Sequence, residues 1–385
     1  MKKNVANKPL KIAMLIRNYS ASGGGAERYC VELTKRLAQQ HEVHVFSQKN
    51  TESSNHIAFH KIPQWLKRPR YLNQLLFSFL TRRATQNQGF DLVHSHDMVT
   101  HANIYTLHVP CVKTKWTQAR GVKKVLRWLG VLLSPRKIAY LWLEQREMRI
   151  LPSRHFISVS EYLSRNILAN YPKLKDNITI AHPGINVHSM NDRQIDTWRK
   201  EFRNTHHIPD SAFVLLFVAH GFKRKGLPSI ITALESLEDE QVHLIVAGNG
   251  NPEEISINSS LVKKNTHFIG VVKAMDELYP VADALIHPTL GDTYGMAVLE
   301  AMSHGLPVVV SGGQYCGLSE QLQYPEAILL DNPTNPIEIK AKIASLYKNP
   351  QLIQTVSTAG QQKASTINWQ KTLDNTLKSY REIKE

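Results

Sequence analysis

Two carboxylates in the second half of the chain, Asp292 and Glu300, have a spacing that suits ligand binding at the start of a helix. The stretch HPTLGDTYGMAVLEAMSHGLPVVVSG, residues 287–312, predicts a strand, a loop, a helix from near residue 295 and a second strand. Free N–H groups in the first helical turn would attract an anion, and the carboxylates could accept hydrogen bonds from sugar hydroxyls beside it. These N–H groups belong to Gly295, Met296 and Ala297. On spacing alone, the two carboxylates could equally be helix caps.

Two further loops follow predicted strands and precede predicted helices, which is where backbone N–H groups can meet a phosphate. The first is SASGGGAER at residues 20–28, in which Arg28 stands where a dinucleotide fingerprint has its third glycine. A tight turn explains this loop equally well. The second, FVAHGFKRKGL at residues 217–227, carries three adjacent cations that could neutralise a diphosphate, although a solvated basic turn is the alternative. The three cations are Lys223, Arg224 and Lys225.

Short apolar strands alternate with helical patterns in two series along the chain. The first series is KIAMLI (11–16), EVHVFS (42–47), DLVHSH (91–96), IYTLHV (104–109), HFISVS (155–160) and ITIAHPG (178–184). The second is FVLLFVAH (213–220), VHLIVAG (242–248), THFIGVV (266–272), ADALIHPT (282–289) and LPVVVSG (306–312). Near-continuous apolar strands between helices indicate parallel sheets that are covered on both faces. We therefore expect an α/β protein of two doubly wound domains that face each other across a cleft, with the domain boundary within residues 182–189.

The net charge of +15 is divided unevenly along the 385 residues. Residues 1–184 carry 29 lysines and arginines against 10 acidic residues, whereas residues 185–385 carry 18 against 22. The first half, with a net charge of +19, is therefore expected to meet an anionic partner: nucleic acid, an anionic membrane or a phosphorylated substrate. No apolar run approaches the roughly 18 residues of a membrane span. The three cysteines are far apart and lack metal-ligand spacing, which predicts buried thiols in a reduced, cytoplasmic setting.

The segment 113–149 is the most basic part of the first half, with ten lysines and arginines against two glutamates. Val122, Val125, Leu126, Leu129 and Leu132 recur within it at helical spacing. A basic helix with such an apolar face, near Trp116, Trp128 and Trp142, is typical of a helix that lodges in an anionic membrane surface. We expect a cytoplasmic protein that is peripheral on the inner face of the cytoplasmic membrane. The alternative is a helix packed on its own domain. Nucleic acid is disfavoured, because the cations coincide with an apolar stripe and not with stacking aromatics on a sheet.

Around Asp292 and Glu300 the sequence GDTYGMAVLEAMSHGLPVV closely resembles the E-x7-E signature of retaining nucleotide-sugar glycosyltransferases with the two-domain GT-B fold (glycosyltransferase family 4, "group 1"). That family includes lipopolysaccharide-core glucosyltransferases. Other stretches are similar in order and spacing: SGGGAER, DLVHSHD, YTLHVP, ISVSEYL, HPGIN, KRKG and VAGNG. The resemblance spans nearly the whole chain. It implies an acceptor-binding Rossmann-like domain at 1–184, joined by a C-terminal helix at 368–385, and a nucleotide-sugar-binding Rossmann-like domain at 185–367.

The resemblance also implies a role for each matching residue. Glu300 would bind the nucleotide ribose, Asp292 would contact the transferred sugar, and Lys225 with Arg224 would grip the donor diphosphate. Four further residues would complete the donor site: Gly24 and Gly25 at the diphosphate, His108 beside the reacting centre and Val272, in the loop after a strand, at the nucleobase. The leaving diphosphate would accept the proton of the attacking hydroxyl, so that no enzymic nucleophile is required.

Two departures from the family pattern are visible in the chain. The first carboxylate is Asp292 where many members have glutamate, and Ala219-His220 stands where many have a glycine–arginine pair. The diphosphate role would therefore fall mainly on Lys225. Because the chain contains no D-x-D, we expect no cofactor and no essential metal, and His94, His96 and Asp97 are interpreted as cleft-lining or structural and not as metal ligands.

The expected reaction is transfer of a hexose, from a UDP-sugar in preference, to an anionic glycan or glycolipid at the membrane, as in lipopolysaccharide-core or surface-polysaccharide synthesis. Four alternatives remain open at this point. They are a GDP-mannose-dependent mannosyltransferase on a lipid-linked precursor, a nucleotide-sugar epimerase of the same fold, a pyridoxal-phosphate-dependent phosphorylase and a non-enzymatic basic protein.

Overall fold

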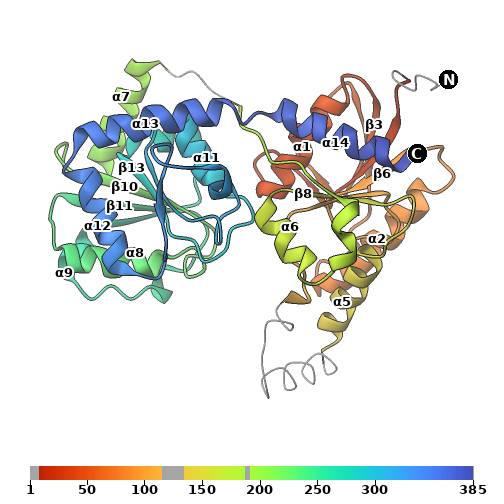
Figure 1. Ribbon diagram of the computed structural model, residues 1–385, viewed down its shortest axis with the longest axis horizontal. Coiled ribbons are helices and arrows are strands. Elements are labelled where there is room, and N and C mark those ends of the chain that lie inside the picture. The colour runs from red at the N-terminus through yellow and green to blue at the C-terminus, as the bar shows by residue number, and fades with distance from the viewer. Residues whose placement is uncertain (1–7, 115–133, 187–190, 385) are drawn as a thin grey trace. The chain divides into compact units, whose positions relative to one another are not determined.

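The computed structural model describes residues 8–114, 134–186 and 191–384 (Figure 1). The chain divides into two compact units. Unit 1 comprises Met1–Pro183 and Trp369–Glu385, and unit 2 comprises Gly184–Asn368. The division after Pro183 lies inside the range 182–189 in which the sequence places the domain boundary.

The described part of unit 1 is built on a seven-stranded sheet in which every pair of neighbouring strands is parallel, in the order β5-β3-β1-β6-β7-β8-β9. The strands are β1 (Lys11–Leu15), β3 (Glu42–Ser47), β5 (Ile57–Lys61), β6 (Leu92–Ser95), β7 (Ile104–Leu107), β8 (His155–Ser158) and β9 (Ile178–Ile180). A separate two-stranded ribbon joins β2 (Asn18–Tyr19) to β4 (Lys49–Asn50). The helices are α1 (Gly25–Leu37), α2 (Arg70–Thr85), α5 (Pro135–Glu147), α6 (Glu161–Leu168) and α14 (Trp369–Lys384), with a 3-10 turn at Pro172–Asn177.

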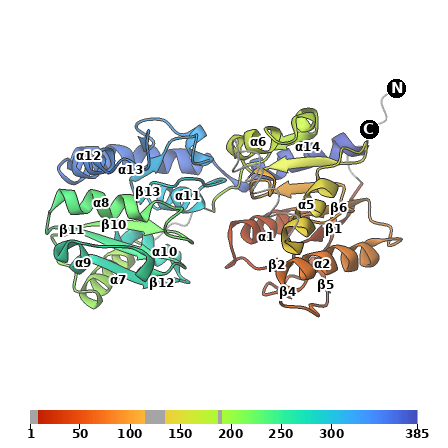
Figure 2. The same ribbon diagram turned by 90° about the horizontal axis from the view of Figure 1, so that it is seen from below.

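Helix α14, at the far end of the chain, is part of the core of unit 1. Its side chains Trp369, Leu373 and Tyr380 are buried in the same apolar cluster as β1 and α1. Thr372 also donates a hydrogen bond of 2.6 Å from its hydroxyl to the carbonyl of His182. Helix α14 packs along β8 and α1, so unit 1 consists of two segments that are distant in sequence (Figure 2).

The described part of unit 2 contains a six-stranded parallel sheet in the order β12-β11-β10-β13-β14-β15. Its strands are β10 (Phe213–Val218), β11 (Val242–Ala247), β12 (Thr266–Gly270), β13 (Ala284–His287), β14 (Val308–Ser311) and β15 (Ile328–Leu330). Its helices are α7 (Asp192–Thr205), α8 (Leu227–Leu237), α9 (Ser260–Lys264), α10 (Met275–Leu278), α11 (Met296–Ser303), α12 (Pro336–Tyr347) and α13 (Pro350–Ser365). Short 3-10 turns lie at Pro252–Glu254, Tyr279–Val281 and Leu318–Gln321.

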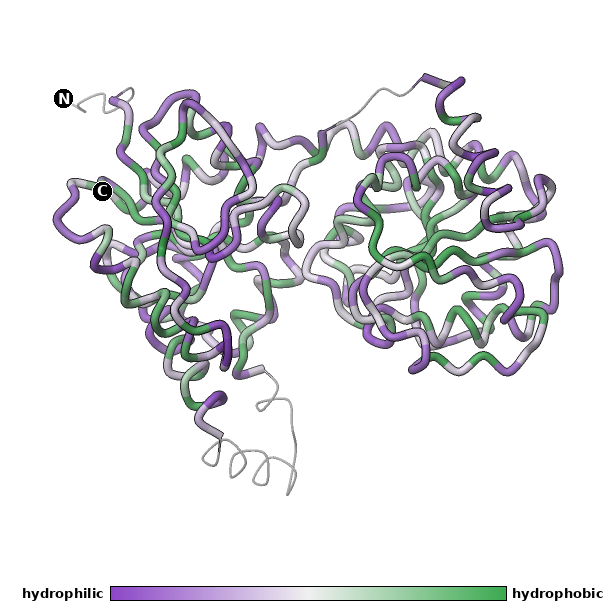
Figure 3. Tube along the Cα trace, turned by 180° about the vertical axis from the view of Figure 1, so that it is seen from behind, coloured by the Kyte–Doolittle hydropathy of each residue, from purple (hydrophilic) through white to green (hydrophobic). Residues whose placement is uncertain are grey.

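Alternate side chains of β10 enter two different apolar clusters, because successive residues of a strand point to opposite faces of the sheet. Val214 and Leu216 belong to the cluster that includes residues of α11, whereas Leu215 and Phe217 belong to the cluster that includes residues of α8 and α12. Burial on both faces explains why these strands are apolar along their whole length (Figure 3).

Each of the eleven predicted strands is present, and the α/β fold predicted from their pattern is confirmed. The prediction missed β5 and β15, each of which is one of the two edge strands of its sheet, together with β2 and β4. In β5 only Ile57 is fully buried, and β15 is three residues long. The exposed residues of β5 and the shortness of β15 leave neither strand with the longer apolar run on which the prediction relied, whereas the other two edge strands, β9 and β12, were predicted.

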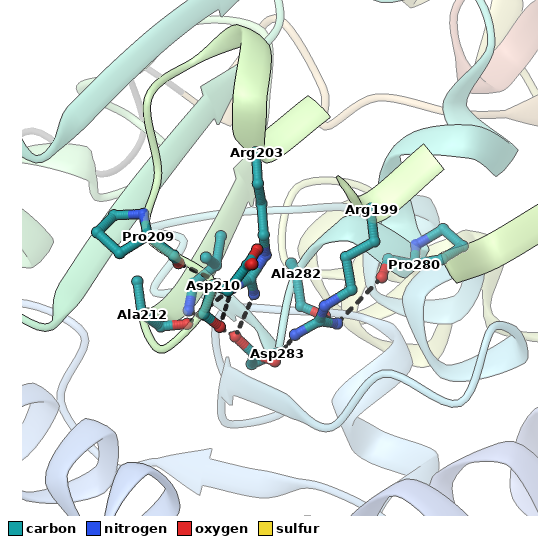
Figure 4. Close-up of polar contacts among 9 residues, drawn as sticks. Arg199, Arg203, Pro209, Asp210, Ala212, Pro280, Ala282 and Asp283 are labelled. Atoms are coloured by element: carbon teal, nitrogen blue, oxygen red, sulfur yellow. Dashed lines mark hydrogen bonds and ion pairs between the residues drawn. The ribbon is translucent and has the colours of Figure 1, made fainter. Parts of the chain in front are cut away.

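Helix α7 is fixed to the sheet of unit 2 by a network around Asp283 (Figure 4). Arg203, whose side chain is 2% exposed, donates to Asp283 at 3.1 Å, and Arg199 forms a second ion pair with the same carboxylate. The backbone N–H of Val214 also donates to Asp283, at 2.7 Å. Arg203 donates further hydrogen bonds to the carbonyls of Pro209, Asp210 and Ala212. A guanidinium this deeply buried requires such partners, because an uncompensated charge in the core is strongly destabilising.

We predict that Asp283→Asn lowers the free energy of unfolding of unit 2 by about 3 kcal/mol, because it leaves the buried charge of Arg203 without its carboxylate. Urea unfolding followed by circular dichroism measures this change. Asp196→Asn, which removes an exposed carboxylate from α7, is the matched control. Equal stability of the two variants would show that Asp283 is not what holds α7.

Candidate active site

The loop between β13 and α11 carries Asp292 and is held in place by a glycine. Gly295 precedes α11 with a φ of 101°, and a Cβ added there would lie 2.7 Å from the sulfur of Cys316. Backbone bonds between Asp292 and the loop at 315–317 fix the carboxylate position. The tight packing explains why glycine stands at the start of this helix.

Asp292 lies at the centre of a compact polar cluster in unit 2. It forms an ion pair with Lys225, accepts a hydrogen bond of 3.1 Å from Nε2 of His287 and accepts another of 3.3 Å from the backbone N–H of Tyr294. Burial raises the pKa of Asp292, but the His287 hydrogen bond and the charge of Lys225 outweigh burial and hold this pKa well below its ordinary value. Asp292 is therefore an ionised carboxylate that is paired with Lys225.

The turn that carries Lys225 is locked to the same loop. Gly226 has a φ of 85°, and a Cβ there would come within 1.9 Å of the carbonyl oxygen of Pro288. The N–H of Leu290 donates to the carbonyl of Arg224 at 3.0 Å, and the Arg224 guanidinium donates back to the carbonyl of Gly291. The exposed Arg224 side chain and the buried Lys225 are thus held at the loop that carries Asp292.

Glu300 lies in the second turn of α11, as predicted, and is half-buried. The hydroxyl of Tyr279 donates to its Oε2 at 2.6 Å. The ring of His304 stacks on Tyr279 with centroids 5.3 Å apart, and Nε2 of His304 lies 3.1 Å from Asp276. Because of these contacts, one oxygen of Glu300 is oriented by the protein.

The other predicted positions of unit 2 lie on or next to α11. No hydrogen bond within the described residues engages the backbone N–H groups of Gly295, Met296 and Ala297. Val272 follows β12, and its side chain packs against the same apolar cluster as Met296. The N-terminus of α11 therefore retains donors for an anion, as the sequence predicts.

Sequence reasoning missed His287 and Tyr279, which hold the two carboxylates. His287 is the last residue of β13, and a polar residue at the end of an apolar run was a signal that the sequence offered. Tyr279 is 21 positions before Glu300 and offered no spacing signal.

Unit 1 has a cavity of about 640 Å³ at the carboxyl ends of β1, β3, β6 and β7. His108 lines it, together with Glu27 from the first turn of α1. Gly24 and Gly25 are the N-cap and first residue of α1 and are exposed. The remaining lining mixes apolar side chains, among them Ile16, Leu107, Val109 and Met148, with cationic, acidic and amide ones, among them Arg17, Lys49, Arg70, Asp97, Glu144, Glu147, Gln48, Asn73 and Gln74. Apolar side chains interspersed with charged and amide groups can bind a ligand that has both apolar faces and hydroxyl groups.

A row of three histidines lies at this cavity: His96 and the partly buried His108 line it, and His94 is fully buried next to them. Nδ1 of His96 lies 3.0 Å from Nε2 of His108. Nδ1 and Nε2 of His94 lie 2.7 Å from the hydroxyls of Tyr380 and Thr106. Burial lowers the pKa of His94 and of His108 to about 3, and it lowers that of His96 well below its ordinary value. The three rings are therefore neutral at physiological pH.

Within the described ranges, no group of three or more histidines, cysteines and acidic residues is arranged to hold a metal ion. The three cysteines are all buried free thiols. None of the described helices is long and apolar enough to cross a membrane. Of the basic segment 113–149, residues 115–133 lie outside the described residues, and the predicted apolar stripe from Val122 to Leu132 is among them.

Two units, each built on a parallel sheet with flanking helices, have the architecture of the GT-B fold of glycosyltransferases. Comparison with known proteins agrees, because residues 199–363 match the Glycosyl transferases group 1 family and residues 23–189 match Glycosyltransferase Family 4. The chain belongs to the group 1 glycosyltransferases. This confirms the family and the enzyme class that the sequence predicts.

Three proteins illustrate its relatives. A D-inositol 3-phosphate glycosyltransferase of Pseudarthrobacter chlorophenolicus is 25% identical over 94% of this chain and 91% of its own. The lipopolysaccharide glucosyltransferase WaaG of Escherichia coli is 30% identical over 40% of this chain and 42% of its own, and a crystal structure of WaaG superimposes with a TM-score of 0.78 at 21% identity over 97% and 99% of the chains. Anabaena HepE, solved in complex with UDP-glucose, gives a TM-score of 0.68 at 16% identity over 97% and 99%.

We predict that the stability of unit 1 falls as the pH is lowered from 6.5. Unfolded histidines bind protons with a pKa near 6.5, whereas the buried rings bind them near pH 3 to 4, so the unfolded state takes up more protons in this window. Each ring contributes on the order of 1 kcal/mol per pH unit.

Replacing one of these rings tests the prediction. His101, whose pKa burial lowers to about 4, has both ring nitrogens buried without a hydrogen-bond partner among the described residues. Between pH 7 and pH 5, the urea midpoint of His101→Leu should therefore fall less than that of wild type. His56 is exposed, and the midpoint of His56→Leu should fall as much as that of wild type. Parallel curves for His101→Leu and wild type would contradict the assignment.

Proposed function

We propose that the protein is a retaining glycosyltransferase that moves a hexose from a UDP-sugar to an anionic glycan or glycolipid at a membrane surface, in lipopolysaccharide-core or surface-polysaccharide synthesis. The observation that carries the proposal is the polar cluster of unit 2, in which Lys225 is paired with Asp292 in the loop before α11 and Glu300 lies in the second turn of that helix.

The arrangement suits a nucleoside diphosphate sugar. An anionic diphosphate would be met by the charge of Lys225, the exposed guanidinium of Arg224 and the N–H groups of the first turn of α11. Glu300, with one oxygen held by Tyr279, would accept hydrogen bonds from the ribose hydroxyls. Preference for UDP is supported by the fold likeness to HepE, whose structure contains UDP-glucose.

The same residues would promote departure of the diphosphate. In a retaining transfer on one face of the sugar, negative charge develops on the leaving diphosphate, and prearranged cations and N–H dipoles stabilise that charge most. The departing phosphate oxygen would take the proton of the attacking hydroxyl. Asp292, which is ionised, would orient the sugar by accepting from its hydroxyls while it holds Lys225. This scheme uses the residues present without a nucleophile.

Unit 1 would bind the acceptor. Its cavity of about 640 Å³ mixes Lys49 and Arg70, two exposed cations, with carboxylates and amides that can share hydrogen bonds with sugar hydroxyls. Exposed cations at the rim favour an acceptor that carries phosphate or carboxylate groups. The name of WaaG as a lipopolysaccharide glucosyltransferase supports an acceptor of that class.

The described part of segment 113–149 supports peripheral membrane binding. In α5, Ile138 is 46% exposed and Trp142 is 45% exposed, and the guanidinium of Arg146 lies 5.5 Å from the Trp142 ring centroid. Helix α5 lies beside α2, which has exposed Phe79 with Arg83 over its ring (Figure 1). Exposed aromatic side chains next to arginines are the composition that binds anionic lipid headgroups.

Calorimetric titration with UDP, GDP and ADP tests the donor assignment. We expect wild type to bind UDP, Glu300→Ala to bind it on the order of 100-fold more weakly, and Tyr279→Phe about tenfold more weakly, because these changes remove or loosen the ribose contacts. Glu277→Gln, at an exposed position before Tyr279, is the control and should bind like wild type. Tight binding of GDP would instead identify the donor as a GDP-sugar. Failure of all three nucleotides to bind would refute the donor site.

Co-sedimentation with vesicles tests the membrane assignment. We expect binding to phosphatidylglycerol vesicles but not to phosphatidylcholine vesicles, weakened by salt because the attraction is partly electrostatic. Trp142→Ser combined with Arg146→Gln should reduce it about tenfold. Tyr324→Ser, at an aromatic of unit 2 that is 68% exposed, is the matched control. Unchanged binding of the double variant would exclude α5 as the contact.

A further inference from the structure

The two neighbouring histidines that follow β6 and β7 share one hydrogen bond. Nδ1 of His96 and Nε2 of His108 are 3.0 Å apart, and the rings are stacked with centroids 5.3 Å apart at 24°. Burial lowers the pKa of both rings far below neutral pH, so each carries one proton on one nitrogen. One ring must donate the shared hydrogen bond and the other must accept it.

The far nitrogen of His96 decides which ring donates. Nε2 of His96 is buried and has no hydrogen-bond partner among the described residues. If the proton of His96 were on Nε2, a buried N–H donor would be left unsatisfied, and such donors are rarer in proteins than unsatisfied acceptors. With the proton on Nδ1, His96 donates to His108, and the group without a partner is the lone pair of Nε2, which is an acceptor.

We infer that His96 is a positioning residue that fixes His108 in the tautomer with its proton on Nδ1, so that His108 presents a hydrogen-bond donor to ligand oxygens in the cavity of unit 1. Because Nε2 of His108 accepts from His96, Nδ1 is the nitrogen left for a ligand, and the ring lines that cavity. A neutral N–H favours hydroxyl and phosphate oxygens and disfavours ammonium groups.

The inferred tautomer also limits what His108 can do in the reaction. A protonated Nδ1 has no lone pair for a proton, so His108 cannot be the general base for an acceptor hydroxyl. This conclusion rests on the proposed transferase function and agrees with its scheme, in which the departing phosphate takes the proton.

The surrounding rings hold His96 in this orientation. His94 stacks on one side of it at 4.7 Å, and His94 is itself placed by the hydroxyls of Thr106 and Tyr380. The ring of Tyr29 contacts both His96 and His108, at centroid distances of 5.8 and 5.1 Å. Rotation of the His96 ring would disturb all of these contacts.

Nitrogen chemical shifts observe the tautomer directly in the full-length chain labelled with 15N-histidine. We expect His108, assigned by loss of its signals in His108→Gln, to show a protonated Nδ1 and an unprotonated Nε2 at pH 7.5. His96→Asn should keep this pattern, because its amide N–H can donate from the place of Nδ1. His96→Leu removes the donor and should give a mixture of tautomers. A protonated Nε2 of His108 in wild type would overturn the inference.

Release of UDP from UDP-glucose provides the functional readout. We expect His96→Leu to lower kcat about tenfold with little change in KM, and His96→Asn to restore most of it, because a correctly placed donor acts on the transition state. His60→Leu breaks a second histidine pair of unit 1, in which Nδ1 of His44 lies 2.8 Å from Nε2 of His60, and should leave kcat unchanged.

The two readouts separate the possible failures. If wild type does not turn over UDP-glucose and does not bind UDP, the proposed function fails while the tautomer assignment is still decided by the nitrogen shifts. If wild type is active and both His96 variants match it in kcat, His96 does not position His108. Thermal unfolding of each variant identifies any that fails to fold, in which case the wild-type shifts alone decide the tautomer.

Discussion

Asp292 carries a negative charge in a largely buried place, and an isolated carboxylate there would take up a proton. The protein avoids this by surrounding the carboxylate with Lys225, with Nε2 of His287 and with a backbone N–H. Lys225 and the loop that carries Asp292 come from different parts of unit 2. They can approach each other because the turns contain Gly226 and Gly295, where a side chain would collide with a carbonyl or a thiol.

The same physical requirement appears in unit 1 with neutral groups. Buried imidazoles stay uncharged, and each needs partners that match its single proton. His94 contacts two hydroxyls, whereas His96 contacts one ring and has one nitrogen without a partner in the part of the chain that the structure describes. In both units the residues assigned to substrate are oriented by a second residue behind them: His96 stands behind His108, Tyr279 behind Glu300 and His287 behind Asp292. Orientation by a fixed neighbour is what allows a side chain to stabilise charge without reorganising.

The sequence was sufficient for the framework and for choosing the residues of the candidate site. Apolar runs located the strands because parallel strands are buried on both faces, and Asp292, Glu300 and Lys225 stood out by residue type and position after strands. The sequence was insufficient for predicting which residues contact and orient these side chains. Lys225 and Asp292 are 67 positions apart, and Tyr279 and Glu300 are 21 apart, so their pairing depends on how strands are ordered in the sheet. Edge strands such as β5 escaped because exposure weakens the pattern that marks a strand.

Helix α14 gives unit 1 an unusual dependence on the order in which the chain is made. Unit 2 is a continuous stretch from Gly184 to Asn368, whereas unit 1 needs residues on both sides of it. During synthesis from the N-terminus, unit 2 has its complete sequence before Trp369 and Tyr380 exist, and domains generally fold as units when their residues are available. Unit 1, although its synthesis begins first, is therefore completed only after unit 2, and His94 gains its partner Tyr380 only once the whole of unit 2 has been synthesised.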